Sequence, residues 1–141
     1  MGTVFDYAVS LQIRHPTVPA NELAAGFPWP MTSGWTAGEP RTTPVGRELG
    51  GVRSESYCSL KIAHGDDGEL TACLSQAVHV IQANGKHWGE CRRTGGRLSF
   101  YVFWYPNGDT GAVLDAGLLG EMAALEIDLH LNFYEDQSKD G

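Results

Sequence analysis

The feature that most constrains the fold of this chain is a strict alternation of apolar and polar residues near both of its ends. Phe5–Arg14 carries an apolar side chain at every second position, and Leu125–Tyr134 repeats the pattern with Ile127, Leu129, Leu131 and Phe133. A period of two is typical of a strand with one buried and one open face. A sheet built from such strands has to be covered on one side only.

The sequence between these two strands predicts further elements of both kinds. Strands are expected at Glu55–Ala63 and Arg97–Tyr105, with a short extended segment ending near Trp35, and helices at Pro19–Ala25, from about Glu69 to Asn84 and from Asp115 to about Leu125. Asn84 and Gly85 predict a left-handed end to the middle helix.

This order of elements favours an α+β fold in a single domain. One-sided strands mixed with helices predict a two-layer sandwich, with a largely antiparallel sheet of about five strands and the helices on one face. A ferredoxin-like topology, or an elaboration of it, fits the order. Residues 1–136 are expected to form this domain, and residues 137–141 a polar C-terminal tail.

The charge of the chain is unevenly distributed. Residues 1–97 contain nine acidic and nine basic residues, whereas residues 98–141 contain eight acidic residues and one lysine, which accounts for the net charge of −7. Nucleic acid binding needs a surplus of Lys and Arg on one face, so a nucleic acid partner is not expected. An acidic C-terminal third suits a basic protein partner instead.

Other features of the sequence bear on location and redox state. No stretch approaches the roughly 20 apolar residues that cross a bilayer, and the N-terminus lacks the basic start and cleavage site of a secretory signal. We therefore expect a cytoplasmic protein without membrane contact. The three cysteines, an odd number without a Cys-x-x-Cys pair, favour buried free thiols.

Motifs of catalysis and cofactor binding are missing from the sequence. It contains no G-x-S-x-G elbow, P-loop, G-x-G-x-x-G or H-E-x-x-H motif. His87 and Cys91 can share a helical face, but no two further ligands accompany them, so no metal or other cofactor is predicted. Glu126, Asp128 and His130 project to the polar face of the last strand, where acid–base catalysis is one use and a solvated surface is the commoner one. No catalytic residue is predicted.

The open face of the sheet is the most informative surface that the sequence predicts. If the even-numbered residues from Leu98 to Trp104 face the core, Tyr101, Phe103 and Tyr105 face outward. Exposed aromatic clusters tend to mark binding sites. The alternatives are that the long loop covers this face, or that a second copy covers it in a homodimer.

The long connection Gly34–Gly51 is too rich in glycine and proline for a helix or a central strand. Three basic residues in and beside it are balanced by three acidic ones, which argues against an anion-binding loop: Arg41, Arg47 and Arg53 against Glu39, Glu48 and Glu55. Trp35 is expected to bury its indole and to anchor the start of the connection.

The run W-T-A-G-E-P at Trp35–Pro40, together with R-H-P, S-Y-C-S-L and the closing L-x-L-x-F-Y, resembles a bacterial family known as domain of unknown function 4279. The likeness covers roughly residues 5–134, and its distinctive part is Trp35, Gly38, Glu39 and Pro40. The family brings no established activity or catalytic residues. Small acidic bacterial families of this kind include immunity proteins, which neutralise a toxin. The link to immunity proteins is an analogy between classes of protein.

Two hypotheses of function follow. The first is a non-enzymatic, immunity-type protein that binds and neutralises a bacterial toxin with a basic surface. Its contacts would be acidic and aromatic residues of the C-terminal third: Tyr101, Phe103, Asp115, Glu121, Glu126, Asp128, His130, Tyr134 and Glu135. The second is a small-molecule-binding module or cryptic enzyme, with a pocket between the open sheet face and the 35–51 loop and with Arg14, Arg41 and His130 as polar contacts. An oligomerising structural subunit is a third reading.

Overall fold

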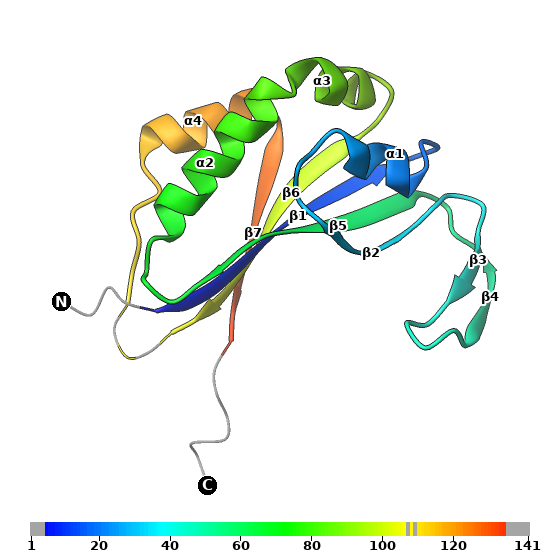
Figure 1. The fold of residues 1–141 in the computed structure, drawn as a ribbon, viewed down its shortest axis with the longest axis horizontal. Helices are drawn as coiled ribbons and strands as arrows, with labels where there is room; N and C mark the ends of the chain where they lie inside the picture. Colours follow the sequence, from blue (N-terminus) through cyan, green and yellow to red (C-terminus); the bar gives the residue numbers. More distant parts are fainter. Residues whose placement is uncertain (1–4, 107, 109, 135–141) are drawn as a thin grey trace, which may run out of the picture.

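A computed structural model describes residues 5–106, 108 and 110–134 of the chain (Figure 1). The strands are β1 (Asp6–His15), β2 (Met31–Trp35), β3 (Pro40–Thr42), β4 (Glu48–Val52), β5 (Ser56–Gly65), β6 (Arg97–Tyr105) and β7 (Ile127–Phe133). The helices are α1 (Ala20–Ala25), α2 (Leu70–Ala83), α3 (Gly85–Arg93) and α4 (Ala116–Ala124). Within the described residues, no helix combines the length and the apolar character that crossing a bilayer requires.

The predicted α+β sandwich is confirmed, and its sheet has the strand order β2-β5-β1-β6-β7. Neighbouring strands are antiparallel except for β6 and β7, which are parallel. The order β2-β5-β1-β6, with α1 and α2 as connections, is that of a ferredoxin-like β-α-β-β-α-β unit. Two elaborations extend it. A small β3–β4 sheet lies between β2 and β5 in the chain, and α4 carries the chain across to β7, as a parallel pair requires.

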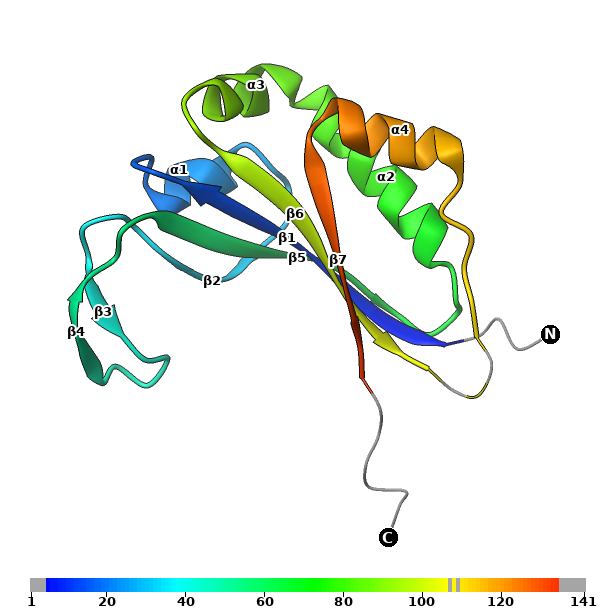
Figure 2. The same ribbon diagram turned by 180° about the vertical axis from the view of Figure 1, so that it is seen from behind.

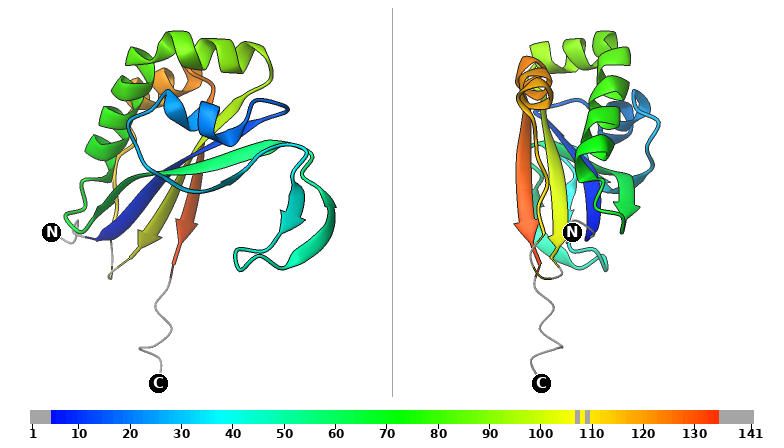
Figure 3. Two further views of the ribbon diagram at one scale, coloured as in Figure 1. Left: turned by 45° about the vertical axis from the view of Figure 1, so that its right-hand side comes forward. Right: turned by 90° about the vertical axis from the view of Figure 1, so that its left-hand side faces the viewer.

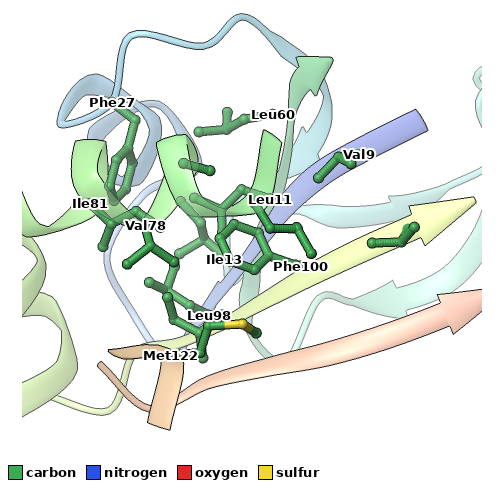
Figure 4. Close-up of a cluster of buried hydrophobic side chains, with 14 of the residues drawn as sticks. Val9, Leu11, Ile13, Phe27, Leu60, Val78, Ile81, Leu98, Phe100 and Met122 are labelled. Atoms are coloured by element: carbon green, nitrogen blue, oxygen red, sulfur yellow. The ribbon is translucent and has the colours of Figure 1, made fainter. Parts of the chain in front are cut away.

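The helices lie on one side of the sheet, as Figures 2 and 3 show. The reason is the alternation along β1 and β6, whose buried positions all face this side. In Figure 4, Leu11 and Phe100 point into the cluster that α2 covers, and both are fully buried. The remaining core residues come from every layer: Val9, Ile13, Leu23, Leu60, Leu74, Val78, Ile81, Trp88, Leu98 and Met122 among others.

The predicted left-handed end of the middle helix is wrong. Asn84 has a φ of −105°, and the chain continues directly into α3 at Gly85. The Asn84 side chain donates to the Val80 carbonyl at 2.9 Å, which satisfies the end of α2 without a left-handed residue. Trp88 and Cys91 of α3 are buried, so core packing favours a second helix here.

The connection between β2 and β5 also contains more regular structure than the sequence predicts. β3 and β4 form an antiparallel hairpin, with Pro40 opposite Val52 and Thr42 opposite Glu48. Both strands are largely exposed, so they lack the alternation of apolar and polar residues from which a strand can be predicted. Gly46, with a φ of 88°, lies in the turn between them, where glycine adopts a positive φ without strain.

The cysteines are free in the structure; Cys58 and Cys91 are buried as predicted, whereas Cys73 is only partly buried. Burial raises the pKa of Cys58 to about 12. Burial, with a smaller contribution from Asp67, raises the pKa of Cys73 to about 11. Both thiols therefore stay protonated at neutral pH, and they pack as small apolar groups.

Candidate functional site

The open face of the sheet carries a continuous row of aromatic rings near β7. Tyr101, Phe103 and Tyr105 of β6 are half-buried and alternate with the buried residues Leu98, Phe100, Val102 and Trp104, so the condition on which they were expected to face outward is met. The parallel register sets His130 beside Tyr101, with ring centroids 4.3 Å apart. Tyr101 and Phe103 are 4.9 Å apart, and Tyr105 lies 5.5 Å from the exposed Tyr134. We call these five residues the aromatic strip.

The other end of the same face is charged. Glu55 binds two arginines, with distances of 3.0 Å to Arg14 and 3.5 Å to Arg97. A shallow hollow of about 110 Å³ beside them is lined by Leu98 and by polar residues of three strands, including Asp128. The positions of Arg97 and Glu55 in this group were not predicted, because they depend on strand register. We call Arg14, Glu55, Arg97 and Asp128 the charged end.

The acidic residues predicted to contact a partner are divided between two layers. Asp115 caps α4, where its carboxylate accepts a hydrogen bond from the Leu118 amide at 2.9 Å. Glu121 of α4 accepts a hydrogen bond from Gln82 of α2. These two residues belong to the helical layer.

The remaining acids of the predicted set are also separated. Glu126 has a φ of 56° in the turn before β7 and lies 3.7 Å from Arg92 of α3. Asp128 lies on the open face beside Ser99. Glu135 is outside the described residues. Within the part of the chain that the structure describes, the predicted acids therefore do not converge on one surface.

The Trp35 indole at the start of the W-T-A-G-E-P segment is half-buried, not buried as predicted, and it contacts two side chains. Tyr57 lies on one side of it, with ring centroids 4.7 Å apart, and the Arg53 guanidinium lies 3.9 Å from its centroid. Arg14 lies 4.7 Å from the Tyr57 ring and extends the stack. Tyr57 faces the open side of the sheet, yet it is only 9% exposed because these neighbours cover it.

Backbone hydrogen bonds explain the other residues of this motif. Gly38 has a φ of 89°, and its amide donates to the Arg53 carbonyl at 2.9 Å. The Arg53 amide donates in turn to the Glu39 carbonyl at 2.8 Å, while the Glu39 carboxylate accepts from the Thr36 amide. Pro40 follows at the start of β3, where a missing N–H is tolerated in a short strand. The motif thus closes a turn that supports the hairpin.

Two hollows flank the Trp35 and Arg53 pair, at the end of the sheet opposite β7. One, of about 400 Å³, lies between β2 and the hairpin and includes Glu39 and Thr42 in its lining. The other, of about 350 Å³, includes Arg41. Arg53 Nε is buried and has no hydrogen-bond partner among the described residues.

The three polar contacts predicted for a small-molecule pocket do not converge. Arg41 lines a hollow at the hairpin, Arg14 belongs to the charged end, and His130 lies in the aromatic strip. The hairpin stands beyond β2, away from β6 and β7, so it does not cover the aromatic strip (Figures 1 and 3).

The His87 and Cys91 pair is used for packing. The His87 ring contacts Phe27 edge-on, with centroids 5.8 Å apart, and its Nε2 lies 3.4 Å from the Leu23 carbonyl of α1. Cys91 is buried in the core. Within the described ranges, no cluster of three or more His, Cys, Asp or Glu residues is arranged to hold a metal ion.

Comparisons of the chain with protein-family models, curated proteins and solved structures give no match. The resemblance to domain of unknown function 4279 therefore stays a prediction, and any assignment of function rests on the surfaces described above.

Proposed function

We propose that this chain is a non-enzymatic, immunity-type binding protein that neutralises a bacterial toxin by docking the aromatic strip on it. The observation that carries the proposal is the strip itself, which sets half-buried tyrosine and phenylalanine rings side by side on the open face. Tyrosine is a favoured anchor in protein interfaces, since it offers a large apolar surface and a polar tip at a low entropic cost.

The charged end supplies the polar border that such an interface needs. Arg14, Arg97, Glu55 and Asp128 carry both signs of charge, so they favour one orientation of a partner over others. Asp115 and Glu121 lie in the helical layer and Glu126 in the turn before β7. They contribute through the net charge of −7, which attracts a basic toxin domain at long range. Their removal is therefore expected to slow association more than it speeds dissociation.

The proposal is tested by co-expression with the product of the neighbouring gene. Rescue of growth and co-purification are expected for the wild-type chain. The double variant Tyr101→Ala with Phe103→Ala should lose both, because it removes the centre of the strip. Trp29→Ala is the matched control, since Trp29 stacks on Phe27 away from the strip and should keep rescue. Failure of the wild-type chain to bind or rescue would contradict the proposal.

A small-molecule-binding module is the second candidate, and the hollows at the hairpin favour it. Arg53 lines the hollow of about 400 Å³, where its guanidinium charge suits an anionic ligand. A thermal-shift screen of metabolites tests it, with Arg41→Ala and Arg53→Lys as variants. A ligand that stabilises the wild-type chain but not these variants supports it, whereas a flat response across a broad library counts against it.

A further inference from the structure

The two edges of the five-stranded sheet differ in how they are protected. β2 is preceded by Pro30, has a register shift between Met31 and Ser33, and includes Gly34. Such features hinder pairing with another strand. β7 has none of them, since its sequence I-D-L-H-L-N-F contains no proline, glycine, lysine or arginine. The β7 edge is therefore the open one.

The hydrogen-bonding groups at this edge follow from the parallel register. The Tyr134 amide donates to the Trp104 carbonyl at 2.8 Å, so even-numbered residues direct their N–H and C=O toward β6. Odd-numbered residues direct these groups outward: Ile127, Leu129, Leu131 and Phe133. Within the described part of the chain, no backbone group pairs with this outer edge.

Apolar side chains accompany these outward groups. Leu131 is 36% exposed and Phe133 is 62% exposed. Both line a hollow of about 510 Å³ with Trp104 and Leu114 on the helical side. An edge with free backbone groups and exposed apolar side chains favours strand addition.

We infer that β7 pairs antiparallel with β7 of a second copy, which joins the two sheets into one continuous sheet. A two-fold axis at Leu129 sets Asp128 opposite His130 of the other copy, twice by symmetry. On the helical side the same register sets Ile127 opposite Leu131. The strand is thus complementary to itself, because the His130 imidazole can donate a hydrogen bond to the Asp128 carboxylate and apolar residues face each other.

This register is favoured over the one centred on His130. Centring on His130 would set two imidazoles opposite each other and would leave Asp128 opposite Asn132. Shifting by a single residue in one copy alone would set polar residues opposite apolar ones, because the side-chain period is two. The complementary Asp128–His130 pairs select the axis at Leu129.

The inference goes beyond the proposed function and does not depend on it. In the joined sheet the two aromatic strips lie on the same face, on either side of the two-fold axis. A dimer would therefore present two partner-binding surfaces side by side. Loss of dimerisation and loss of toxin binding are measured separately, so either result can stand without the other.

The first experiment needs no variant. Sedimentation velocity over roughly a hundredfold range of concentration should show a reversible monomer–dimer equilibrium. Amide exchange at low concentration should be fast at Leu129 and Leu131 and slow at His130, and the two odd-numbered amides should become protected as the dimer forms. A chain that is monomeric throughout overturns the inference, as does protection of these amides in the monomer.

Edge variants locate the interface. Leu131→Lys should weaken the dimer about tenfold or more, because a charge would be buried in the β7 pairing. Met31→Lys is the matched control at the β2 edge, where Met31 is 46% exposed, and should leave dimerisation unchanged. The reverse result overturns the inference. Circular dichroism checks that both variants fold. If one of them does not fold, the amide-exchange measurement on the wild-type chain tests the inference instead.

A charge swap tests the register. Asp128→His and His130→Asp each set like groups opposite each other, and each should weaken the dimer about threefold to tenfold. The double variant restores the complementary pair in reversed order and should recover the wild-type affinity. Additive losses in the double variant would contradict the axis at Leu129.

Discussion

Phe100 and Phe103 are the same kind of residue on the same strand, yet they belong to different parts of the molecule. Phe100 faces the helices and is fully buried. Phe103 faces the open side, is half-buried and contacts Tyr101 and Tyr105. The difference teaches that on a one-sided sheet the face of a residue decides its role. One face builds the core, and the other stays partly exposed to solvent.

The largest expected effect on stability comes from truncating the buried member of this pair, Phe100. Phe100→Ala should lower the free energy of unfolding by about 3 to 5 kcal/mol, because it leaves a cavity between β6 and α2. Phe103→Ala should lower it by about 1 kcal/mol, since water already reaches its ring. Urea denaturation of both variants measures the difference. If Phe100→Ala does not fold, Phe100→Leu serves instead, with an expected loss of about 1 kcal/mol. Equal losses at the two positions would contradict the one-sided core.

Tyr57 is a buried aromatic residue on the open face, where Trp35 and its other neighbours cover it. Trp35→Ala should lower the free energy of unfolding by about 1 to 2 kcal/mol through loss of the Tyr57 stack and the Arg53 contact. Limited proteolysis should cut more rapidly within the β3–β4 hairpin. Trp35→Phe keeps part of the contact with Tyr57, so its stability and cleavage rate should lie between those of Trp35→Ala and the wild-type chain. An unchanged cleavage rate in Trp35→Ala would mean that the indole does not hold the hairpin.

The faces of the long strands could be predicted from sequence because they depend on a local property. Alternation with a period of two assigns each side chain of β1 to one face, whatever the strand order, whereas β6 is apolar on both sides and its facing had to be assumed. The same pattern implied helices on one side and therefore the sandwich. Tyr101 and Phe103 lie on the open face because the assumed condition holds: Leu98, Phe100, Val102 and Trp104 are buried on the other face.

Features that depend on tertiary contacts could not be predicted in this way. The β3–β4 hairpin has no buried face and hence no periodic signal. The acidic residues of the C-terminal third are close in sequence but do not form one surface, because Asp115 caps a helix and Glu126 faces Arg92. The neighbours of His130 and Asp128 follow only from the parallel register of β7.

His15 is a buried polar residue on the face of the sheet that the helices cover. The ring is 1% exposed, Nδ1 accepts from the Thr17 and Val18 amides at 3.0 and 2.9 Å, and Nε2 lies 2.8 Å from Thr94 Oγ1. Burial lowers the pKa of His15 below its ordinary value of 6.5. Below pH 6.5 the unfolded chain therefore binds a proton that the folded chain does not, so the free energy of unfolding should fall as the pH drops, by at most about 1.4 kcal/mol per pH unit.

The decline ends when the pH reaches the folded pKa of His15. His15→Asn keeps an acceptor near the Nδ1 position and removes the titration, so its stability should depend less on pH below 6.5. Denaturation curves of both proteins at a series of pH values measure the difference. The other histidines are common to both proteins and cancel in the comparison. Parallel pH profiles would show that His15 is not the group responsible.

The last comparison uses two glycines, each with open space where a side chain would stand, for which opposite signs are expected. Gly120 lies within α4 and should gain about 0.5 to 1 kcal/mol of stability on Gly120→Ala, because alanine loses less backbone entropy on folding. Gly38 has a φ of 89°, so Gly38→Ala should cost about 1 to 2 kcal/mol despite the same open space. Thermal unfolding of both variants checks the opposite signs. A loss of stability in Gly120→Ala would mean that the added methyl group meets a neighbour, and therefore that the surface of α4 at Gly120 is not open to solvent.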